Sequence, residues 1–373
     1  MKYSKFLVKS IESEVGNNNF IKYLPIEFDL DSADYSKNSY FKQYGFNVPN
    51  YIKDVYSQCS GIESDKYIPT DLYYFYIIPY LNNFKQTPAI FDKNNYDIIF
   101  QGVNMPKCII KKQNGYIYRE RTEYKNLITY DQAVNILKTH SEFIIKPSID
   151  SGCGKGVMRV KCEGLNDNQL KELLEDYTAD FIVQEIVQQH EILNRLNKTS
   201  LNTMRIVTYR RGFNDFVHLG TVLRFGREGT YLDNACAGGR NLRILSNGKA
   251  DRIVRSSRTF KQENLDDIFG VDELVIPNYD KVLDFCYQLH ARVPYLNFCG
   301  WDITIDCKGK PLLIELNNYP DCELIQTNCG PLFGEYTDEI MEKVSGFTVE
   351  WKAGVRKVFK DGHEDETIYC DLK

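Results

Sequence analysis

Residues 300–317 read GWDITIDCKGKPLLIELN, and this stretch decides the fold. Two runs of alternating residues flank a Lys-Gly turn signal at 308–309, so we predict a β-hairpin. If the turn has two residues, counting outward places Asp302 directly opposite Glu315. Residues paired in this way share one face of a sheet, with Cβ atoms about 4.5–5.5 Å apart. The hairpin therefore brings two carboxylates together.

The face that these carboxylates share has a third oxygen donor. Asn317 lies two residues beyond Glu315 and projects from the same face, whereas we expect Ile314 and Leu316 to point the other way into a core. Facing like charges destabilise a sheet unless a positive charge lies between them. Carboxylate and amide oxygens suit Mg²⁺. On this stretch alone, a solvated hairpin face is an equally good interpretation.

Composition limits the class of protein. The chain has 373 residues, of which 46 are basic and 51 acidic, so nothing indicates binding of nucleic acid. A hydrophobic content of 43% is typical of a folded globular protein. We expect no membrane span, no signal peptide and a cytoplasmic location. The eleven cysteines include no CxxC pair, which argues against a zinc site or a disulfide framework.

A second informative segment, residues 146–156, begins with Lys146 and contains glycines at alternate positions. We predict strands at 143–146 and 157–160, joined by this loop. Glycines let a backbone approach a ligand closely, and successive N–H groups can form an anion site. The segment is neither a Walker A motif nor a Rossmann fingerprint, because a strand follows the loop. Taken alone, it reads as a plain hairpin connection.

The pattern along the rest of the chain predicts interleaved helices and strands without strict alternation. This is typical of an α+β protein rather than of a parallel doubly wound sheet. Helices are expected at 130–139, from an Asp167 N-cap to Asp176, and along Val282, Phe285, Cys286, Leu289 and Val293. Further strands are expected at 181–184, 204–210 and 216–225.

The order of these segments resembles the ATP-grasp superfamily over roughly residues 90–330. The shared features are a Lys-ended strand, a Gly-rich loop, the segment 184–187, an Arg-bearing strand and the distal Asp…Glu-x-Asn hairpin. The segment from Asp92 to Pro106 is similar to one in D-alanine–D-alanine ligase. The closest resemblance is to the sugar-transfer-associated ATP-grasp group, which is linked to cell-surface polysaccharide synthesis. Residues 184–190, 200–208, 233–234, 238–239 and 300–302 carry it.

The resemblance implies an ATP-grasp fold in which two α+β subdomains clamp ATP, preceded by a mixed N-terminal region. The expected boundaries are 1–126, 127–187 for the subdomain with the Gly loop, 188–345 for the subdomain with the metal site, and 346–373 for the tail. Either His190 or Glu191 would reach the ribose. The expected nucleotide-binding residues are Lys93, Lys146, Ser151, Gly152, Gly154, Gly156, Gln184, Glu185, Val187, His190 and Glu191; the expected Mg²⁺ ligands are Asp302, Glu315 and Asn317.

One departure from the ligase pattern concerns catalysis. D-alanine–D-alanine ligase has an arginine two residues before its metal-binding Asp, whereas this chain has Gly300. Arg205 would hold the γ-phosphate or an acyl phosphate through its planar fork. Arg205, Arg224 or Asn234 would take the place of the missing arginine, or the acceptor chemistry differs.

The resemblance implies an ADP-forming carboxylate–amine ligase that uses ATP and Mg²⁺. Its substrates would be a small-molecule or sugar-linked carboxylate, such as a uronic acid, and an amine such as an amino acid, with polysaccharide-biosynthesis enzymes as possible partners. Two alternatives stay open: a phosphotransferase acting on a hydroxyl, and a nucleotide-binding module without turnover.

Overall fold

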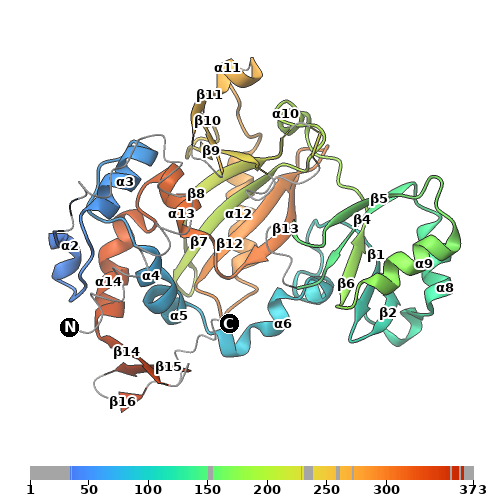
Figure 1. The fold of residues 1–373 in the computed structure, drawn as a ribbon, viewed down its shortest axis with the longest axis horizontal. Coiled ribbons are helices and arrows are strands. Elements are labelled where there is room, and N and C mark those ends of the chain that lie inside the picture. Colours follow the sequence, from blue (N-terminus) through green and yellow to red (C-terminus); the bar gives the residue numbers. More distant parts are fainter. Residues whose placement is uncertain are drawn as a thin grey trace.

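The computed structural model describes residues 34, 36–149, 154–227, 229–230, 238–257, 261–270, 273–352, 355–360 and 363–364. Figure 1 shows two sheets side by side, with helices packed on each. Within both sheets all neighbouring strands are antiparallel. The predicted α+β class is therefore confirmed.

The smaller sheet has six strands in the order β3-β2-β1-β6-β4-β5. Helices α8 (Tyr130–Leu137) and α9 (Asp167–Asp176) cover one face of it and share its apolar core. Because β1 and β2 lie before residue 127, the sheet extends across the expected boundary at 126. Its strands are β1 Cys108–Gln113, β2 Tyr116–Arg119, β3 Leu127–Ile128, β4 Glu142–Pro147, β5 Met158–Lys161 and β6 Phe181–Gln184.

Helix α9 begins one residue earlier than predicted. Its N-cap is Asn166, whose side chain accepts a hydrogen bond from the N–H of Gln169, while the Gln169 side chain bonds back to the Asn166 N–H. This reciprocal capping box satisfies two helix-end N–H groups. The prediction of Asp167 as the cap is therefore wrong by one position, and Asp167 is instead the first helical residue.

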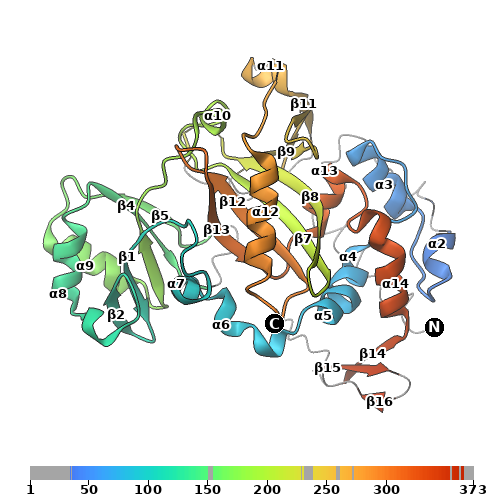
Figure 2. The ribbon, with the colours of Figure 1, turned by 180° about the vertical axis from the view of Figure 1, so that it is seen from behind.

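The larger sheet has seven strands in the order β11-β10-β9-β8-β7-β12-β13. Helix α12 (Tyr279–His290) packs on one face, as Figure 2 shows, and its apolar side is buried against that face. The short helix α11 (Leu265–Phe269) follows β11. The strands are β7 Thr203–Gly212, β8 Asp215–Phe225, β9 Arg240–Ile244, β10 Ala250–Ser256, β11 Gln262–Asn264, β12 Phe298–Ile305 and β13 Pro311–Asn317.

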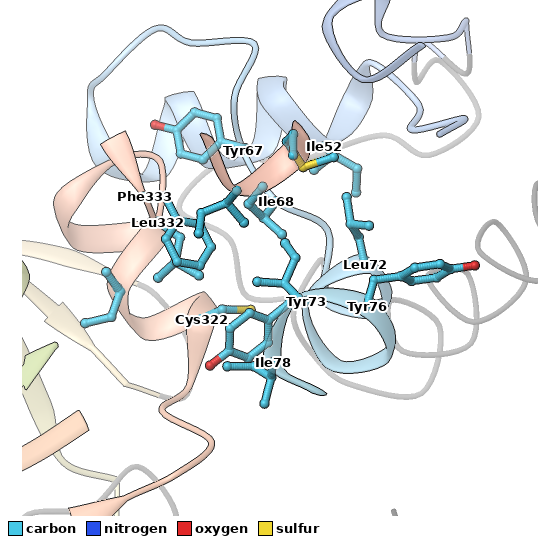
Figure 3. Close-up of a cluster of buried hydrophobic side chains, with 14 of the residues drawn as sticks. Ile52, Tyr67, Ile68, Leu72, Tyr73, Tyr76, Ile78, Cys322, Leu332 and Phe333 are labelled. Atoms are coloured by element: carbon cyan, nitrogen blue, oxygen red, sulfur yellow. The ribbon is translucent and has the colours of Figure 1, made fainter. Parts of the chain in front are cut away.

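The opposite face of the larger sheet is covered by helices from both ends of the chain. Val207, Tyr209, Val222 and Phe298 of the sheet pack there against the helices and their connecting segments. Figure 3 shows this core, with Tyr73 beside Cys322 and with Leu332 and Phe333 nearby. The helices involved are α2 Ser39–Lys42, α3 Tyr51–Ser60, α4 Thr70–Leu72, the π-helix η2 Tyr73–Ile77, α5 Ile78–Leu81, α13 Cys322–Cys329 and α14 Thr337–Ser345.

These helices occupy only part of that face. Because side chains alternate along a strand, Arg205 projects from the same face as Val207, and Asp302 from the same face as Phe298. The helices cover the part of this face that carries Val207 and Phe298. The part that carries Arg205 and Asp302 faces the smaller sheet. The remaining elements are η3 Phe84–Gln86, α6 Pro88–Phe91, η4 Lys93–Asn95, α7 Tyr96–Ile99, η5 Tyr124–Asn126, α10 Glu191–Asn194, η8 Gly334–Tyr336, and a separate sheet of β14 Phe347–Lys352, β15 Val355–Lys360 and β16 His363–Glu364.

Candidate active site

The β12–β13 hairpin places Asp302 opposite Glu315, as predicted, but by a different route. The turn has three residues between Asp306 and Lys310: the N–H of Gly309 donates to the Asp306 carbonyl at 2.9 Å, and Gly309 has φ 78°. This left-handed position is typical of three-residue hairpin loops. The longer turn shifts the pairing by one residue, and the register shifts back between Asp302 and Ile303. The predicted two-residue turn is therefore wrong.

The second shift is a bulge at Ile314. Leu313 pairs with Ile303 and Glu315 pairs with Asp302, so Ile314 has no partner on β12. An extra residue of this kind re-aims its side chain. Ile314 is half-buried and lines a cavity, whereas Leu313 and Leu316 lie in the core. The prediction that Ile314 points into the core is therefore wrong, and that for Leu316 is confirmed.

Asp302 is held by two arginines from neighbouring strands. Arg205 of β7 contacts it with both arms of its fork, Nε to Oδ1 at 2.5 Å and Nη2 to Oδ2 at 3.2 Å. Arg224 of β8 donates from Nη2 to Oδ2 at 2.9 Å and to Thr203 Oγ1 at 2.7 Å. Burial alone would raise the pKa of Asp302, but the two guanidinium groups outweigh it and hold the pKa at about 2. Asp302 is therefore ionised at neutral pH.

Glu315 is paired with Lys93. The two side chains meet at 2.9 Å, with Lys93 almost fully buried and Glu315 about one-third exposed (33%). Lys93 lies in η4, and its backbone N–H donates to the carbonyl of Ser148 at 2.9 Å, just beyond β4. This bond joins the segment before the smaller sheet to the start of the Gly-rich loop. The structure therefore brings Lys93 to Glu315 on the β12–β13 hairpin, and the contact of Lys93 with a phosphate stays a prediction.

Lys146 adds a second buried ammonium at the end of β4. Burial, reinforced by the charge of Lys93, lowers the pKa of Lys146 to about 8, although Glu315 and Asp302 oppose the shift. Four cationic side chains thus surround two carboxylates, so the positive charges outnumber the negative ones. The cations are Lys93, Lys146, Arg205 and Arg224. The result is a net positive region, which attracts anionic groups.

The Gly-rich loop joins β4 to β5 as predicted, and its second half is described. Gly154 and Gly156 have φ 71° and 72°, conformations that side-chain-bearing residues rarely adopt. A methyl group on Gly156 would also lie 2.9 Å from Cγ of Pro147. The Tyr177 hydroxyl donates to the Gly156 carbonyl at 2.5 Å. Ser151 and Gly152 lie outside the described residues, as does Asn234.

A cavity of about 340 Å³ lies between the two sheets. The smaller sheet contributes side chains from β4, β5 and β6, and the larger sheet contributes β7, β8, β12 and β13. One end carries the charged residues described above. Predicted site residues that line it are Lys146, Gly154, Gln184, Glu185, Val187, Arg205, Arg224, Asp302, Glu315 and Asn317.

Lys93, Gly156, His190 and Glu191 are not among the residues that line this cavity. Lys93 contacts Glu315, which does line the cavity. His190 is the N-cap of α10, and its Nδ1 accepts a hydrogen bond from the N–H of Ile192 at 3.2 Å. Glu191 is exposed in the first turn of the same helix. A short helix thus uses the His190 side chain locally, and in this structure it does not turn either residue toward the cavity.

Several lining residues were missed by the sequence analysis. Arg159 on β5 lines the cavity and forms a two-pronged pair with Glu142, at 2.9 and 3.0 Å. Strand alternation from Val157, which also lines the cavity, would have identified it. Asn194 and Lys198 come from the connection between β6 and β7, where the sequence has no periodicity to indicate orientation.

The residues on the hairpin face fit Mg²⁺ by their chemistry. Asp302, Glu315 and Asn317 share one face, because Asp302 pairs with Glu315 and Gly300 pairs with Asn317. The Asn317 amide nitrogen is buried with no hydrogen-bond partner. Among the described residues, no group of three or more His, Cys, Asp or Glu side chains could hold a metal ion. The set would thus consist of two carboxylates and one amide, completed by water and substrate oxygens.

Gly300 explains the departure from the ligase pattern in steric terms. A methyl group at this position would lie 2.6 Å from Cβ of Pro320, 3.1 Å from Cδ of Arg205 and 3.4 Å from Cβ of Asn317. The space next to the peptide is therefore filled by Pro320 and by the stem of Arg205. An arginine side chain at position 300 would displace both.

The comparison with known families agrees with this arrangement. The family model described as "Sugar-transfer associated ATP-grasp" matches residues 75–337. The chain belongs to this ATP-grasp family. The membership expected from the sequence is thus confirmed, and the match includes both sheets of the candidate site. No curated protein matches the sequence significantly.

Solved structures with a similar arrangement include several ATP-grasp enzymes. The ligase PsnB with a minimal precursor matches at 14% identity and TM-score 0.41, covering 70% of this chain and 64% of its own. D-cycloserine synthetase DcsG matches at 13% identity and TM-score 0.42, covering 70% and 73%. The D-alanine–D-alanine ligase from Coxiella burnetii matches at 10% identity and TM-score 0.39, covering 71% and 60%. The chain thus spans less than two-thirds of the PsnB chain.

The ATP-grasp chain has two further general properties. No helix in the described part is both long and apolar enough to cross a bilayer. The eight cysteines that the structure describes form no disulfide with one another, and Cys59, Cys286, Cys299 and Cys322 are buried. Burial raises the pKa of the Cys59 thiol to about 12, which keeps it protonated and unreactive.

Proposed function

We propose that this protein is an ATP-dependent, ADP-forming carboxylate–amine ligase that acts in cell-surface polysaccharide synthesis. The observation that carries the proposal is the charged end of the cavity, where Arg205 and Arg224 meet Asp302 beside Lys146 and the Lys93–Glu315 pair. Such a site neutralises a triphosphate and the charge that develops during phosphoryl transfer. The family description, which names an association with sugar transfer, supports the proposed polysaccharide setting.

The cavity offers two chemically distinct ends for ATP. Ile144, Val157 and Ile314 supply apolar contacts and the segment 184–187 supplies backbone groups, a combination suited to adenine. Lys146 and Gly154 lie between this region and the arginines and would bind the phosphates. Asp302, Glu315 and Asn317 would hold Mg²⁺, which supplies charge neutralisation and polarisation of phosphoryl oxygens.

In the proposed reaction, a substrate carboxylate oxygen attacks the γ-phosphorus of ATP, forming an acyl phosphate as the bond to ADP breaks. The nitrogen of a neutral amine then attacks the acyl carbon. The C–O bond to phosphate breaks, the amide forms, and the amine proton leaves with the released phosphate. Arg205 and Arg224 would stabilise the transferring phosphoryl group and the tetrahedral oxyanion, which needs fixed donors.

The protonation states favour a carboxylate acceptor over a hydroxyl acceptor. A hydroxyl needs a base to take its proton, whereas a carboxylate is already ionised at neutral pH. Asp302 is a poor base, because its pKa is held at about 2. Glu315 is paired with Lys93, and Glu185 is paired with Lys107 at 3.2 Å. The described cavity lining thus supports a ligase better than a hydroxyl kinase.

The test measures ADP formed from ATP in the presence of Mg²⁺. Each mixture combines one carboxylate, from a set that includes uronic acids and sugar nucleotides, with one amino acid. We expect release to require both a carboxylate and an amine. With an ¹⁸O-labelled carboxylate, one labelled oxygen should appear in the inorganic phosphate. A phosphorylated hydroxyl product without amine dependence would support the kinase alternative. Nucleotide binding without ADP release in any mixture would support the non-catalytic module.

A further inference from the structure

Asn82, a buried residue of the N-terminal region, hydrogen-bonds to the start of β12 and to the residue that follows β13. Asn82 follows α5 and is 1% exposed. Its Oδ1 accepts from the N–H groups of Asn297 and Phe298, both at 3.0 Å. Its Nδ2 donates to the carbonyls of Phe298 at 2.9 Å and Asn318 at 3.1 Å. The amide thereby uses both donors and both acceptor positions on backbone groups.

These four bonds lie at one end of the candidate metal site. Phe298 is the first residue of β12 and lies on the same face as Asp302. Asn318 directly follows Asn317, the last residue of β13. The neighbouring backbone strengthens the join, since the Asn83 N–H donates to the Tyr295 carbonyl at 2.8 Å. Asn82 therefore fixes the strand ends that frame Gly300 and Asn317.

The same N-terminal segment also fixes the chain beyond Asn317. The Tyr73 hydroxyl donates to the Pro320 carbonyl at 2.5 Å, and Pro320 in turn packs on Gly300. Phe84 stacks on Tyr319 with ring centroids 4.4 Å apart and planes 3° apart. In Figure 3, Tyr73 lies beside Cys322 at the start of α13. Residues 318–320 are thus held in place from the N-terminal side.

We propose that Asn82 is a positioning residue that sets the Mg²⁺ affinity of the nucleotide site by fixing Asn317. The proposal rests on the proposed function, because it assigns Asn317 to the metal. Groups that orient metal ligands typically change metal affinity by about 10–100-fold when they are removed. Residues 184–187, which we propose to contact adenine, are not among the partners of Asn82. Metal-free nucleotide affinity should therefore be independent of Asn82.

The experiment compares Asn82→Ala with Asn83→Ala in the full chain. Asn83 is a matched control, because it is the adjacent asparagine and its buried Oδ1 accepts no hydrogen bond from the described residues. Alanine at this position keeps the backbone N–H that donates to the Tyr295 carbonyl. Binding of the non-hydrolysable analogue AMPPNP is measured by calorimetry in EDTA and across a Mg²⁺ titration. Calorimetric stoichiometry separates a loss of folded protein, which lowers the number of sites, from a change in affinity.

We expect Asn82→Ala to raise the half-saturating Mg²⁺ concentration by about tenfold, with a change in EDTA of less than about twofold. Asn83→Ala should match the wild type in both conditions. Equal behaviour of the two variants, or an equal loss with and without Mg²⁺, would overturn the proposal. If Asn82→Ala does not fold, Tyr73→Phe removes one bond to Pro320, and we expect about a threefold shift in the same direction; no shift would count against the proposal. A wild type that binds AMPPNP without any Mg²⁺ dependence would instead refute the proposed function.

Discussion

Asp302 lies directly opposite Glu315 across the β12–β13 hairpin, and a three-residue turn and a one-residue bulge combine to produce this pairing. The turn shifts the register by one residue and the bulge at Ile314 shifts it back. Without the bulge, Ile314 would face Asp302 and Glu315 would turn to the core side. The bulge thus places Glu315, instead of Ile314, opposite Asp302 and beside Lys93, while Ile314 lines the cavity.

The two carboxylates should differ in what their amide variants do. We expect Glu315→Gln to lower ADP formation by at least about 100-fold, because it weakens charge stabilisation at the phosphates. Its effect on the melting temperature should be smaller than that of Asp302→Asn, since Glu315 is one-third exposed (33%), although the buried Lys93 loses its anionic partner. Asp302→Asn should lower stability by about 3–5 kcal/mol, because the buried Arg205 and the partly buried Arg224 lose their anionic partner.

Calorimetric melting and an ADP-release assay check this pair. Glu163→Gln is the control, since it removes the same charge from an exposed turn. It should match the wild type in both measurements. An active Glu315→Gln variant would contradict the assignment of the metal hairpin.

Lysine variants of the two arginines should also differ, one affecting mainly stability and the other mainly kcat. Arg205 grips Asp302 with two bonds and is buried, so Arg205→Lys should lower stability, because an ammonium cannot reproduce the fork. Arg224 contributes one bond to Asp302 and one to Thr203. We expect Arg224→Lys to fold normally and to lower kcat by about 100-fold, as loss of a fixed oxyanion donor does. Urea unfolding measures the stability of each variant. Steady-state kinetics, with the carboxylate and amine that support ADP release, measure its kcat.

Gly300 should not tolerate a side chain. Gly300→Ala places a methyl group 2.6 Å from Cβ of Pro320 and 3.1 Å from Cδ of Arg205. We expect a loss of about 1–3 kcal/mol in the free energy of unfolding, as for overpacking of a core. Gly346→Ala is the matched control, because nothing lies within 4 Å of the added methyl group and its φ is −78°. Equal stability of both variants by urea unfolding would show that Pro320 moves freely.

Acid should destabilise the protein through a buried histidine. His290 bonds to Thr208 Oγ1 at 2.8 Å and to the Leu296 carbonyl at 2.9 Å, and Trp301 donates to the same Thr208 oxygen. Burial lowers the pKa of His290 from 6.5 to about 3. Between these values the unfolded chain binds a proton that the native protein does not. The free energy of unfolding should therefore fall by about 1.4 kcal/mol per pH unit as the pH drops below 6.5.

Urea unfolding at pH 7, 6 and 5 tests this dependence. His218 adds to the slope in the same direction, because burial lowers its pKa to about 4. His290→Asn should be less stable at pH 7 but should lose about half of the wild-type slope between pH 6 and pH 5. An unchanged slope would mean that His290 does not titrate with unfolding.

The sequence alone predicted the strands that build the site and most of the residues on them. Strand β6 occurs at 181–184, where the sequence predicted it, and the Gly-rich loop joins two strands as expected. Alternation places Glu315 and Asn317 on one face of β13 without any knowledge of distant contacts, but Asp302 shares that face only because the turn and the bulge compensate. The same rule would have identified Arg159 on β5, because it lies two residues after Val157, which also lines the cavity.

Features that depend on irregular backbone or on distant packing were not predictable. The bulge at Ile314 leaves no signal in an alternating apolar run, and the use of His190 as a helix cap depends on where α10 begins. The contacts of Asn82 join positions 216 and 236 residues apart in the chain. Local sequence determined which residues share a strand face, because backbone geometry fixes that alternation. Only the tertiary structure decided that Arg205 and Arg224 hold Asp302 and that Asn82 fixes the ends of the hairpin. These contacts arise when separate strands and helices pack around one buried site.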